Sequence, residues 1–178
     1  MSSRIPLAYN PKVLELFRNP KNLGKMENPD AEALAGSLAC GDMVAVYLRI
    51  DKETQVITEA MFESYGCAAN IAASSVMTVM AKGRTLEEAW KISWKDISDD
   101  LGTLPVVKSH CGILAVGALR RAIRNYFKDK PAPAWLPEKP TPDERHAVEE
   151  ERLLEVLTRR AKRLEAELRE ESPGEEKG

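Results

Sequence analysis

One stretch in the first half of the chain has the alternating pattern of side chains that is typical of a half-buried β-strand. Residues 43–50 place apolar side chains at every second position, at Val44, Val46, Leu48 and Ile50. After the polar run 51–54, residues 55–65 are interpreted as a second strand, so the two stretches predict a β-hairpin. The segment 33–38 before them is interpreted as an extended approach to Cys40.

Helical periodicity begins after Gly66. Residues 67–81 carry apolar side chains three or four positions apart, and Gly83 stands where such a helix would stop. Residues 85–88 have the form of a capping box that opens another helix. A short helix is also predicted after Asn10, because the proline that follows it suits the first helical position.

A longer helix is predicted over residues 111–127, where apolar side chains form a stripe with the helical period. Three arginines fall off this stripe and are interpreted as a solvated face: Arg120, Arg121 and Arg124. Because the predicted strands come first and the helices later, the expected fold class is α+β.

A proline-rich stretch divides the chain into a domain, a linker and a tail. Proline fixes φ and removes a backbone donor, so residues 131–141 are predicted to form an extended linker after a domain over residues 1–130. Residues 142–178 are predicted to form a long C-terminal amphipathic helix. Its apolar seam repeats with alternating spacings of three and four, at Leu154, Leu157, Ala161, Leu164 and Leu168. This seam is expected to pack on the chain's own domain or on a second copy, which would give a homo-oligomer.

Composition narrows the classes of partner. With 178 residues, the chain is long enough for one domain and an appendage. Its formal net charge of -2 gives little attraction for nucleic acid. No apolar run approaches the ~18 residues that cross a bilayer, and no signal-peptide pattern opens the chain. We therefore expect a cytoplasmic protein without nucleic-acid or membrane partners.

The cysteines are the first candidates for chemistry. Three of them, Cys40, Cys67 and Cys111, cannot all pair internally, and a reducing compartment keeps thiols free. Cys67 and Cys111 stand at predicted helix starts, whose partial positive charge favours the thiolate, and Lys108 would act in the same direction. Thiolates are the ligands that soft metals prefer, although free cysteines are also common as small core residues.

The candidate ligands indicate a metal centre in which cysteine sulfurs do not fill every ligand position. No Cys-x-x-Cys clamp is present, which disfavours a permanent structural zinc site. Iron-sulfur clusters are usually held by four thiolates, so one position falls to Asp42, His110 or an outside group. A rival interpretation is a thiol enzyme, with a cysteine nucleophile activated by His110 and oriented by Asp42. It is disfavoured because neighbouring residues on a helix start, such as His110 and Cys111, are expected to point apart.

Three segments in order carry a family resemblance: 62–69 (FESYGCAA), 81–89 (AKGRTLEEA) and 104–111 (LPVVKSHC). Together with Cys40-Gly41-Asp42, they resemble the U-type iron-sulfur cluster assembly scaffolds, the NifU-like or IscU-like family. The resemblance extends over about residues 9–127. It implies a three-stranded antiparallel sheet packed by several helices, and a scaffold that is not an enzyme.

The resemblance also implies a cargo, partners and roles for residues. A cysteine desulfurase would deliver sulfur, an iron donor would supply iron, and a two-iron two-sulfide cluster would pass to apo-proteins. By motif position, Cys40, Cys67 and Cys111 would be cluster ligands and sulfur acceptors. Asp42 or His110 would be the fourth ligand, with Asp42 aiding release, and Lys108 would lie beside the site. A four-iron four-sulfide cluster held across a dimer is the larger alternative.

Two features of the sequence indicate which branch of the family it resembles and whether a dedicated chaperone binds it. The 43 residues between Cys67 and Cys111 leave no room for the insertion that marks the SufU-like branch, which favours the IscU-like branch. A SufU-like, zinc-dependent persulfide acceptor is kept as the alternative function, and zinc could fill the cluster-free site. Val106 stands where the chaperone-binding stretch of many relatives has a second proline, so no dedicated chaperone is assigned.

Overall fold

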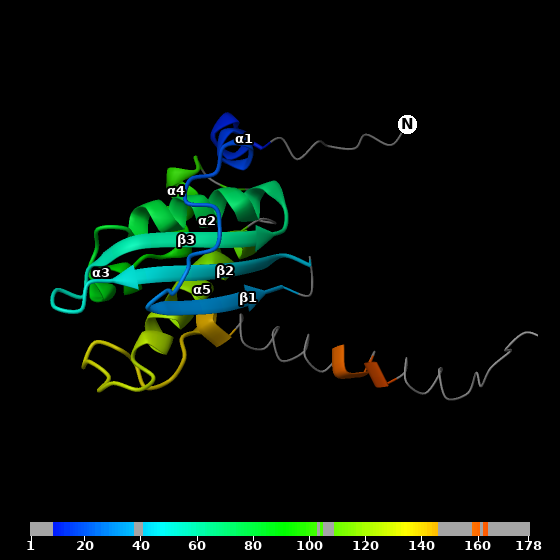
Figure 1. Ribbon diagram of the computed structural model, residues 1–178. Helices are drawn as coiled ribbons and strands as arrows, with labels where there is room; N and C mark the ends of the chain where they lie inside the picture. The colour runs from blue at the N-terminus through cyan, green and yellow to red at the C-terminus, as the bar shows by residue number, and fades with distance from the viewer. Residues whose placement is uncertain are drawn as a thin grey trace, which may run out of the picture.

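The computed structural model describes residues 9–37, 41–102, 104, 109–145, 158–160 and 162–163. Figure 1 shows the elements in chain order: α1 (Pro11–Arg18), β1 (Ala31–Gly36), β2 (Met43–Ile50), β3 (Ile57–Tyr65), α2 (Ala68–Ala81), α3 (Leu86–Trp90), α4 (Trp94–Asp100) and α5 (Ser109–Tyr126). Strands come first and helices later, with α1 before both. The expected α+β class is confirmed.

The three strands form one antiparallel sheet in the order β1-β2-β3. β2 and β3 are the predicted hairpin, and the turn between them is held by the Asp51 carboxylate, which accepts from the Glu53 and Thr54 backbone N–H groups. β1 pairs with the other side of β2, so that Val46 lies between Ala33 and Phe62 in register. The side chains of these alternate positions share the inner face of the sheet, which explains the apolar period of the sequence.

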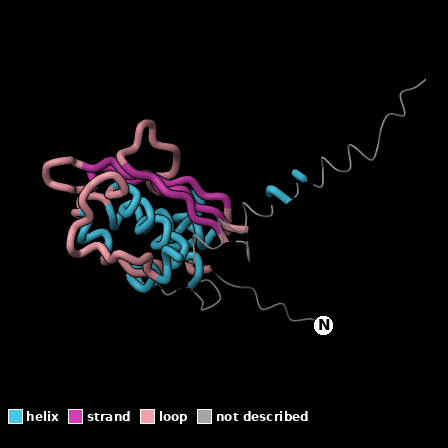
Figure 2. Tube along the Cα trace, turned by 90° about the horizontal axis from the view of Figure 1, so that it is seen from below, coloured by secondary structure: helices cyan, strands magenta, loops and turns pink. Residues whose placement is uncertain are grey.

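The helices α2 to α5 lie on this inner face, as Figure 2 shows with the sheet seen edge-on. α5 packs against β1 and β2, and α2 packs against β3. The core between these layers contains fully buried side chains from both, including Leu48, Phe62, Met77 and Leu119. Removing this apolar surface from water is the main free-energy gain of the fold. The packing fixes where the first turns of α2 and α5 lie relative to the sheet.

Local signals set the helix ends. Asn10 caps α1, because its side chain accepts the Val13 N–H. Thr85 and Glu88 form the predicted capping box of α3, and α4 has a second capping box between Ser93 and Asp96. Each of these reciprocal pairs satisfies backbone donors that a helix leaves free at its start.

The segment 131–145, called the strap here, packs along α5 and α3. Trp135 lies 6.1 Å from Trp90 and 5.8 Å from Phe127, measured between ring centroids. Leu136 is buried beside them, so the proline-rich stretch contributes to the core. The domain boundary at residue 130 stays a prediction, but the residues that follow it contact the domain closely.

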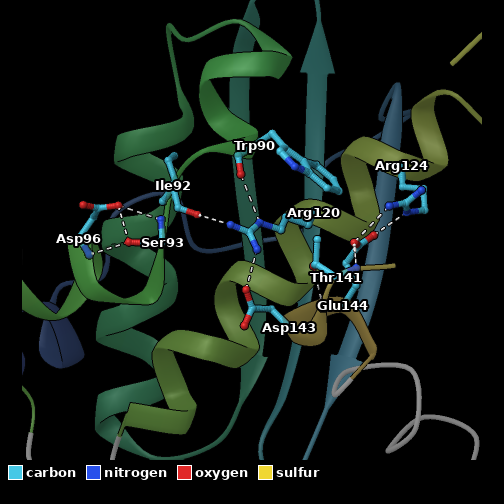
Figure 3. A network of polar contacts seen from close by, with 9 residues as sticks. All are labelled: Trp90, Ile92, Ser93, Asp96, Arg120, Arg124, Thr141, Asp143 and Glu144. Carbon is cyan, nitrogen blue, oxygen red and sulfur yellow. Dashed lines mark hydrogen bonds and ion pairs between the residues drawn. The ribbon is translucent and has the colours of Figure 1, made fainter. Parts of the chain in front are cut away.

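Two ion pairs fasten the end of the strap to α5 (Figure 3). Arg120 pairs with Asp143 at 2.6 Å, and Arg124 pairs with Glu144 at 2.6 Å, where Glu144 is only 1% exposed. The expectation that the α5 arginines form a solvated face is therefore wrong, and Arg121 also donates to the Leu34 carbonyl of β1. The helical period locates an apolar stripe, but it cannot indicate that acidic residues some twenty positions later fold back onto the polar side.

Only a few residues of the predicted C-terminal helix are described. Residues 158–160 and 162–163 are helical and exposed, whereas the five apolar seam positions lie outside the described residues. Within the part of the chain that the structure describes, no helix combines the length and the apolar character needed to span a membrane.

Candidate metal centre

Four of the six predicted site residues meet at one end of the sheet. Asp42 directly precedes β2, Cys67 is the N-cap of α2, and His110 and Cys111 lie in the first turn of α5. The start of β2 pairs with the end of β3, so the chain leaves β3 for α2 beside Asp42. Layer packing then places the start of α5 against both.

The donor atoms lie close enough to share one metal ion. The sulfur atoms of Cys67 and Cys111 are 3.6 Å apart, and the Cys111 sulfur lies 3.7 Å from His110 Nε2 and 3.9 Å from Asp42 Oδ2. The ligand atoms of Asp42, His110 and Cys111 all lie within 4.8 Å of one another. Around a tetrahedral ion with metal–sulfur bonds of about 2.3 Å, ligand sulfurs lie roughly 3.8 Å apart. The grouped atoms of Asp42, His110 and Cys111 could therefore hold one metal ion, and the Cys67 sulfur lies at a ligand-like distance from that of Cys111.

Burial gives the centre a closed side and an open side. Asp42 is 3% exposed and Cys111 is fully buried, whereas Cys67 and His110 are half-buried. The His110 and Cys111 side chains also approach each other, so the expectation that they point apart is wrong. Because Cys111 is buried, this contact does not offer an accessible nucleophile beside its base.

The electrostatics of the centre favour a thiolate at Cys67. A hydrogen bond from the Cys111 thiol lowers the pKa of Cys67 from 9.0 to about 6, although partial burial acts in the opposite direction. A backbone hydrogen bond from Asn70 lowers this pKa further, and the Asp42 charge raises it. The more exposed member of the sulfur pair therefore favours the thiolate at neutral pH, and the thiolate is the form of cysteine that binds metals and attacks electrophiles.

Asp42 is held by the backbone on both sides. Its Oδ1 accepts the Cys67 N–H at 3.1 Å, which ties the carboxylate to the start of α2. Its carbonyl accepts the Ser37 N–H, and the Ser37 carbonyl accepts the Gly41 N–H, each at 2.7 Å. These bonds close the β1–β2 turn, where Gly41 has a left-handed φ of 73° that glycine adopts readily. Two of the predicted site residues, Cys40 in this turn and Lys108 before α5, lie outside the described residues.

Gly66 borders the side chains of both Asp42 and Asn70, and the sequence does not predict this arrangement. A Cβ at Gly66 would lie 2.8 Å from Asp42 Oδ1 and 2.7 Å from the Asn70 side-chain nitrogen. Gly66 therefore makes room for both side chains, and Asn70 donates in turn to Ser64 Oγ at 3.0 Å. In the sequence, the only sign of this arrangement is that Gly66 stands between the predicted strand 55–65 and Cys67, where it indicates the end of the strand.

A small α+β domain with thiolates, a carboxylate and an imidazole at one end of its sheet defines a class of metal-handling protein. The family model described as NifU-like N terminal domain matches residues 8–132, which is more than half of the chain. This chain belongs to the NifU-like N-terminal domain family, as the resemblance predicted.

Named relatives agree with this assignment. The chain is 46% identical over 120 residues to the "Iron-sulfur cluster assembly scaffold protein IscU 1" of Archaeoglobus fulgidus, a match that covers 67% of this chain and 77% of the relative. It is 41% identical over 127 residues to the "Iron-sulfur cluster assembly scaffold protein IscU" of Azotobacter vinelandii, covering 70% and 98%. The match to the "Nitrogen fixation protein NifU" of Trichormus azollae, at 44% identity, covers 66% of this chain and 41% of the longer relative.

Solved structures share the fold over about two thirds of this chain. A putative scaffold protein for the SUF system from Fervidobacterium islandicum superposes with a TM-score of 0.56 at 25% identity, covering 65% of this chain and 96% of the other. The N-terminal part of a NifU-like protein from Brucella abortus gives a TM-score of 0.53 at 27% identity, covering 66% and 93%. The three-stranded sheet with several helices is thus confirmed as the family fold.

Proposed function

We propose that this chain is a scaffold on which iron-sulfur clusters are assembled and from which they are passed on. The observation that carries this proposal is the group of donor atoms from Asp42, His110 and Cys111 at one open-sided centre, with the Cys67 sulfur 3.6 Å from that of Cys111. The iron-sulfur cluster is the cargo of this site. The names of the relatives support the same function, since they are described as cluster assembly scaffolds.

Sulfur enters through Cys67 in this proposal. Of the two described cysteines, Cys67 is half-buried and Cys111 is fully buried, so only Cys67 is open to an incoming sulfur donor. Its thiolate attacks the outer sulfur of a persulfide on a cysteine desulfurase. A new sulfur–sulfur bond forms on Cys67, the persulfide bond of the donor breaks, and the donor cysteine leaves as a thiolate. A two-electron reductant from outside the chain then releases the transferred sulfur as sulfide and restores the Cys67 thiolate.

The ligand set then holds the cargo loosely. Cys40, Cys67 and Cys111 supply soft thiolates to a two-iron two-sulfide cluster, and Asp42 or His110 completes the shell. A carboxylate oxygen is a harder ligand than sulfur, so Asp42 binds such iron more weakly than a fourth thiolate would. This weak position is where the cluster is opened for transfer. Lys108 is proposed to lie beside the site.

The partners follow from this cycle. A cysteine desulfurase supplies sulfur, an iron donor supplies iron, and apo iron-sulfur proteins receive the cluster, while no dedicated chaperone is assigned. A homo-oligomer formed through the C-terminal helix, or through a four-iron four-sulfide cluster shared by two chains, is part of the proposal. The chain itself is proposed to be no enzyme, because the scaffold holds and releases its cargo without turning over a substrate of its own.

Anaerobic reconstitution tests the function directly. The full chain is incubated with ferrous iron, L-cysteine and a cysteine desulfurase, and the sulfide-to-iron charge-transfer bands are followed by absorption. We expect coloured protein with about two irons and two sulfides per chain, and loss of colour when Cys40, Cys67 or Cys111 is replaced by serine. Ser74→Ala, in the buried middle of α2, serves as the matched control and should load normally. Colourless wild-type protein contradicts the proposal.

A second candidate is a zinc-dependent persulfide acceptor of the SufU-like type. The likeness to a putative scaffold for the SUF system and the compact group of Asp42, His110 and Cys111 favour it specifically. Metal analysis of protein purified without added metal separates the two functions. One tightly held zinc per chain, together with failure to form a cluster after zinc removal, supports the second candidate.

A further inference from the structure

Asn70 carries a buried side-chain oxygen without a partner. The residue is fully buried in the first turn of α2, and its Nδ2 donates to Ser64 Oγ at 3.0 Å. Its Oδ1 has no hydrogen-bond partner among the residues that the structure describes. An unsatisfied buried carbonyl is destabilising, so such a group calls for an explanation.

The position of Asn70 in α2 suggests which donor it could accept. Cys67 is the N-cap of this helix and makes no side-chain cap, which places Asn70 at the third helical position, N3. In a capping box, the N3 side chain accepts the backbone N–H of the N-cap residue. In α2 the Cys67 N–H goes instead to Asp42 Oδ1, at 3.1 Å. The usual acceptor is thus displaced by a candidate metal ligand.

Two other helices of this chain show that the alternative bond can be made. In α3, Glu88 at N3 accepts the Thr85 N–H at 2.9 Å. In α4, Asp96 at N3 accepts the Ser93 N–H at 2.8 Å. Aspartate and asparagine side chains have the same length, so Asn70 can reach the N–H of its own N-cap.

Asn70 and Asp42 also approach the same backbone segment. A Cβ at Gly66 would lie 2.7 Å from Asn70 Nδ2 and 2.8 Å from Asp42 Oδ1. Both side chains therefore border the peptide that carries the Cys67 N–H. Asp42 accepts that hydrogen in the structure, whereas Asn70 Oδ1 has no hydrogen-bond partner among the described residues.

We propose that Asn70 is a positioning residue: its side-chain oxygen takes over the Cys67 N–H when the Asp42 carboxylate turns to the metal cargo. This inference rests on the proposed function, because it requires Asp42 to become a ligand. Without the exchange, an Asp42 carboxylate that turns its Oδ1 to the metal would leave the Cys67 N–H unpaired at the edge of the core. With it, one hydrogen bond replaces another, and the Cys67 backbone stays in place while Asp42 moves.

Amide hydrogen exchange at Cys67 measures the proposed bond in the full chain, with Zn²⁺ as a diamagnetic probe. In wild-type protein we expect the Cys67 N–H to be protected without zinc and with it. In Asn70→Ala, we expect protection without zinc, through Asp42, and a loss of at least tenfold when zinc is bound. Ser74→Ala removes the other buried unpaired side-chain oxygen, one turn along α2, and should behave as wild type.

A measurement without zinc tests whether Asn70 can accept the Cys67 N–H when no metal is bound. In Asp42→Ala, Asn70 should take the Cys67 N–H even without zinc, so the amide stays protected. The double variant Asp42→Ala, Asn70→Ala should lose that protection by at least tenfold. Equal protection in the single and double variants overturns the inference, as does an Asn70→Ala protein whose Cys67 amide stays protected with zinc bound.

Zinc affinity gives a second readout. Loss of one buried hydrogen bond in the loaded state should weaken zinc binding about tenfold in Asn70→Ala and leave it unchanged in Ser74→Ala. Unchanged affinity in Asn70→Ala overturns the inference but leaves the scaffold function standing. A wild-type chain that binds neither zinc nor a cluster contradicts the proposed function, while the measurement without zinc still decides the role of Asn70.

Discussion

One carboxylate, that of Asp42, faces two different groups at the centre. Oδ1 accepts the Cys67 N–H, and Oδ2 lies 3.9 Å from the Cys111 sulfur. The carboxylate therefore caps the start of α2 and also lies next to the sulfur of a candidate ligand. A ligand with a second attachment in the protein can leave the metal for that attachment, which is useful in a site that releases its cargo.

Replacement of Asp42 tests this role in release. In Asp42→Ala we expect the assembled cluster to be lost or transferred several-fold more slowly, because the weak oxygen ligand no longer opens the shell. Cluster transfer to an apo-ferredoxin, followed by circular dichroism, is the measurement. Glu59→Ala, at an exposed carboxylate of β3, is the control. Faster loss in Asp42→Ala would show that Asp42 holds the cluster instead of releasing it.

The pH dependence of thiol reactivity tests the sulfur pair. The hydrogen bond from Cys111 lowers the pKa of Cys67 to about 6, so alkylation of Cys67 in cluster-free protein should rise through pH 6 and be nearly complete by pH 7. Cys111→Ala removes the first cause of this shift and should move the midpoint upward toward 9.0. Mass spectrometry after brief iodoacetamide treatment measures each cysteine separately. A wild-type midpoint above pH 8 contradicts the prediction.

The lowered pKa of Cys67 also makes the free energy of unfolding depend on pH. The folded pKa lies below the unfolded value of 9.0, so the unfolded chain binds more protons between about pH 6 and pH 9. The contribution of this thiolate is fully present above pH 9 and is lost as the pH falls through 6.

At the scale of elements, helix starts carry both the fold and the site. The capping box of α3 was predicted from the sequence because Thr85 and Glu88 have the required spacing. α2 has no such pair, since the group that accepts its N-cap N–H comes from the turn before β2. Local spacing therefore predicts a cap that lies within one helix, and it cannot predict one that another element supplies.

The strap is an element held by one buried charge pair. Arg124→Ala should lower the free energy of unfolding by about 3 kcal/mol, because it leaves the Glu144 carboxylate buried without its partner. Arg49→Ala breaks the Arg49–Glu59 pair, in which both side chains are largely exposed, and should change stability by less than about 1 kcal/mol. Urea unfolding of the two variants measures both values. Equal effects contradict the assignment of the strap to the core.

At the scale of the whole molecule, the strap extends the folded unit beyond the family match. The family model ends at residue 132, whereas Trp135, Leu136 and Glu144 pack on α3 and α5. Figure 3 shows that the strap forms ion pairs with arginines in the C-terminal half of α5. The same helix carries His110 and Cys111 in its first turn, so the strap helps to fix a helix that supplies two candidate ligands.

Two shortened chains test the extent of the folded unit. A chain that ends at residue 145 should melt near the full-length temperature, because it keeps every described contact of the strap. A chain that ends at residue 130 loses the burial of Trp135 and Leu136, at least about 3 kcal/mol, and should melt roughly 10 °C lower. Calorimetry of both chains is the measurement. Identical melting temperatures would mean that the strap adds nothing to the domain.

The class of the fold can be predicted from the sequence, because the periods of β2, α2 and α5 reflect burial that each element imposes on its own residues. The sequence also placed Cys67 and Cys111 at helix starts, because local signals such as Gly66 and the helical period mark those starts. The resemblance of four short segments indicated the family. Each of these depends on residues that are near one another along the chain.

Tertiary structure alone decided how the site is supported. The contact of Asp42 with the Cys67 N–H spans 25 positions, and the pairing of Arg124 with Glu144 spans 20. The buried oxygen of Asn70 likewise becomes visible only when α2 is packed on the sheet. Polar partners carry no period along the chain, so they emerge only when packing brings separate elements together.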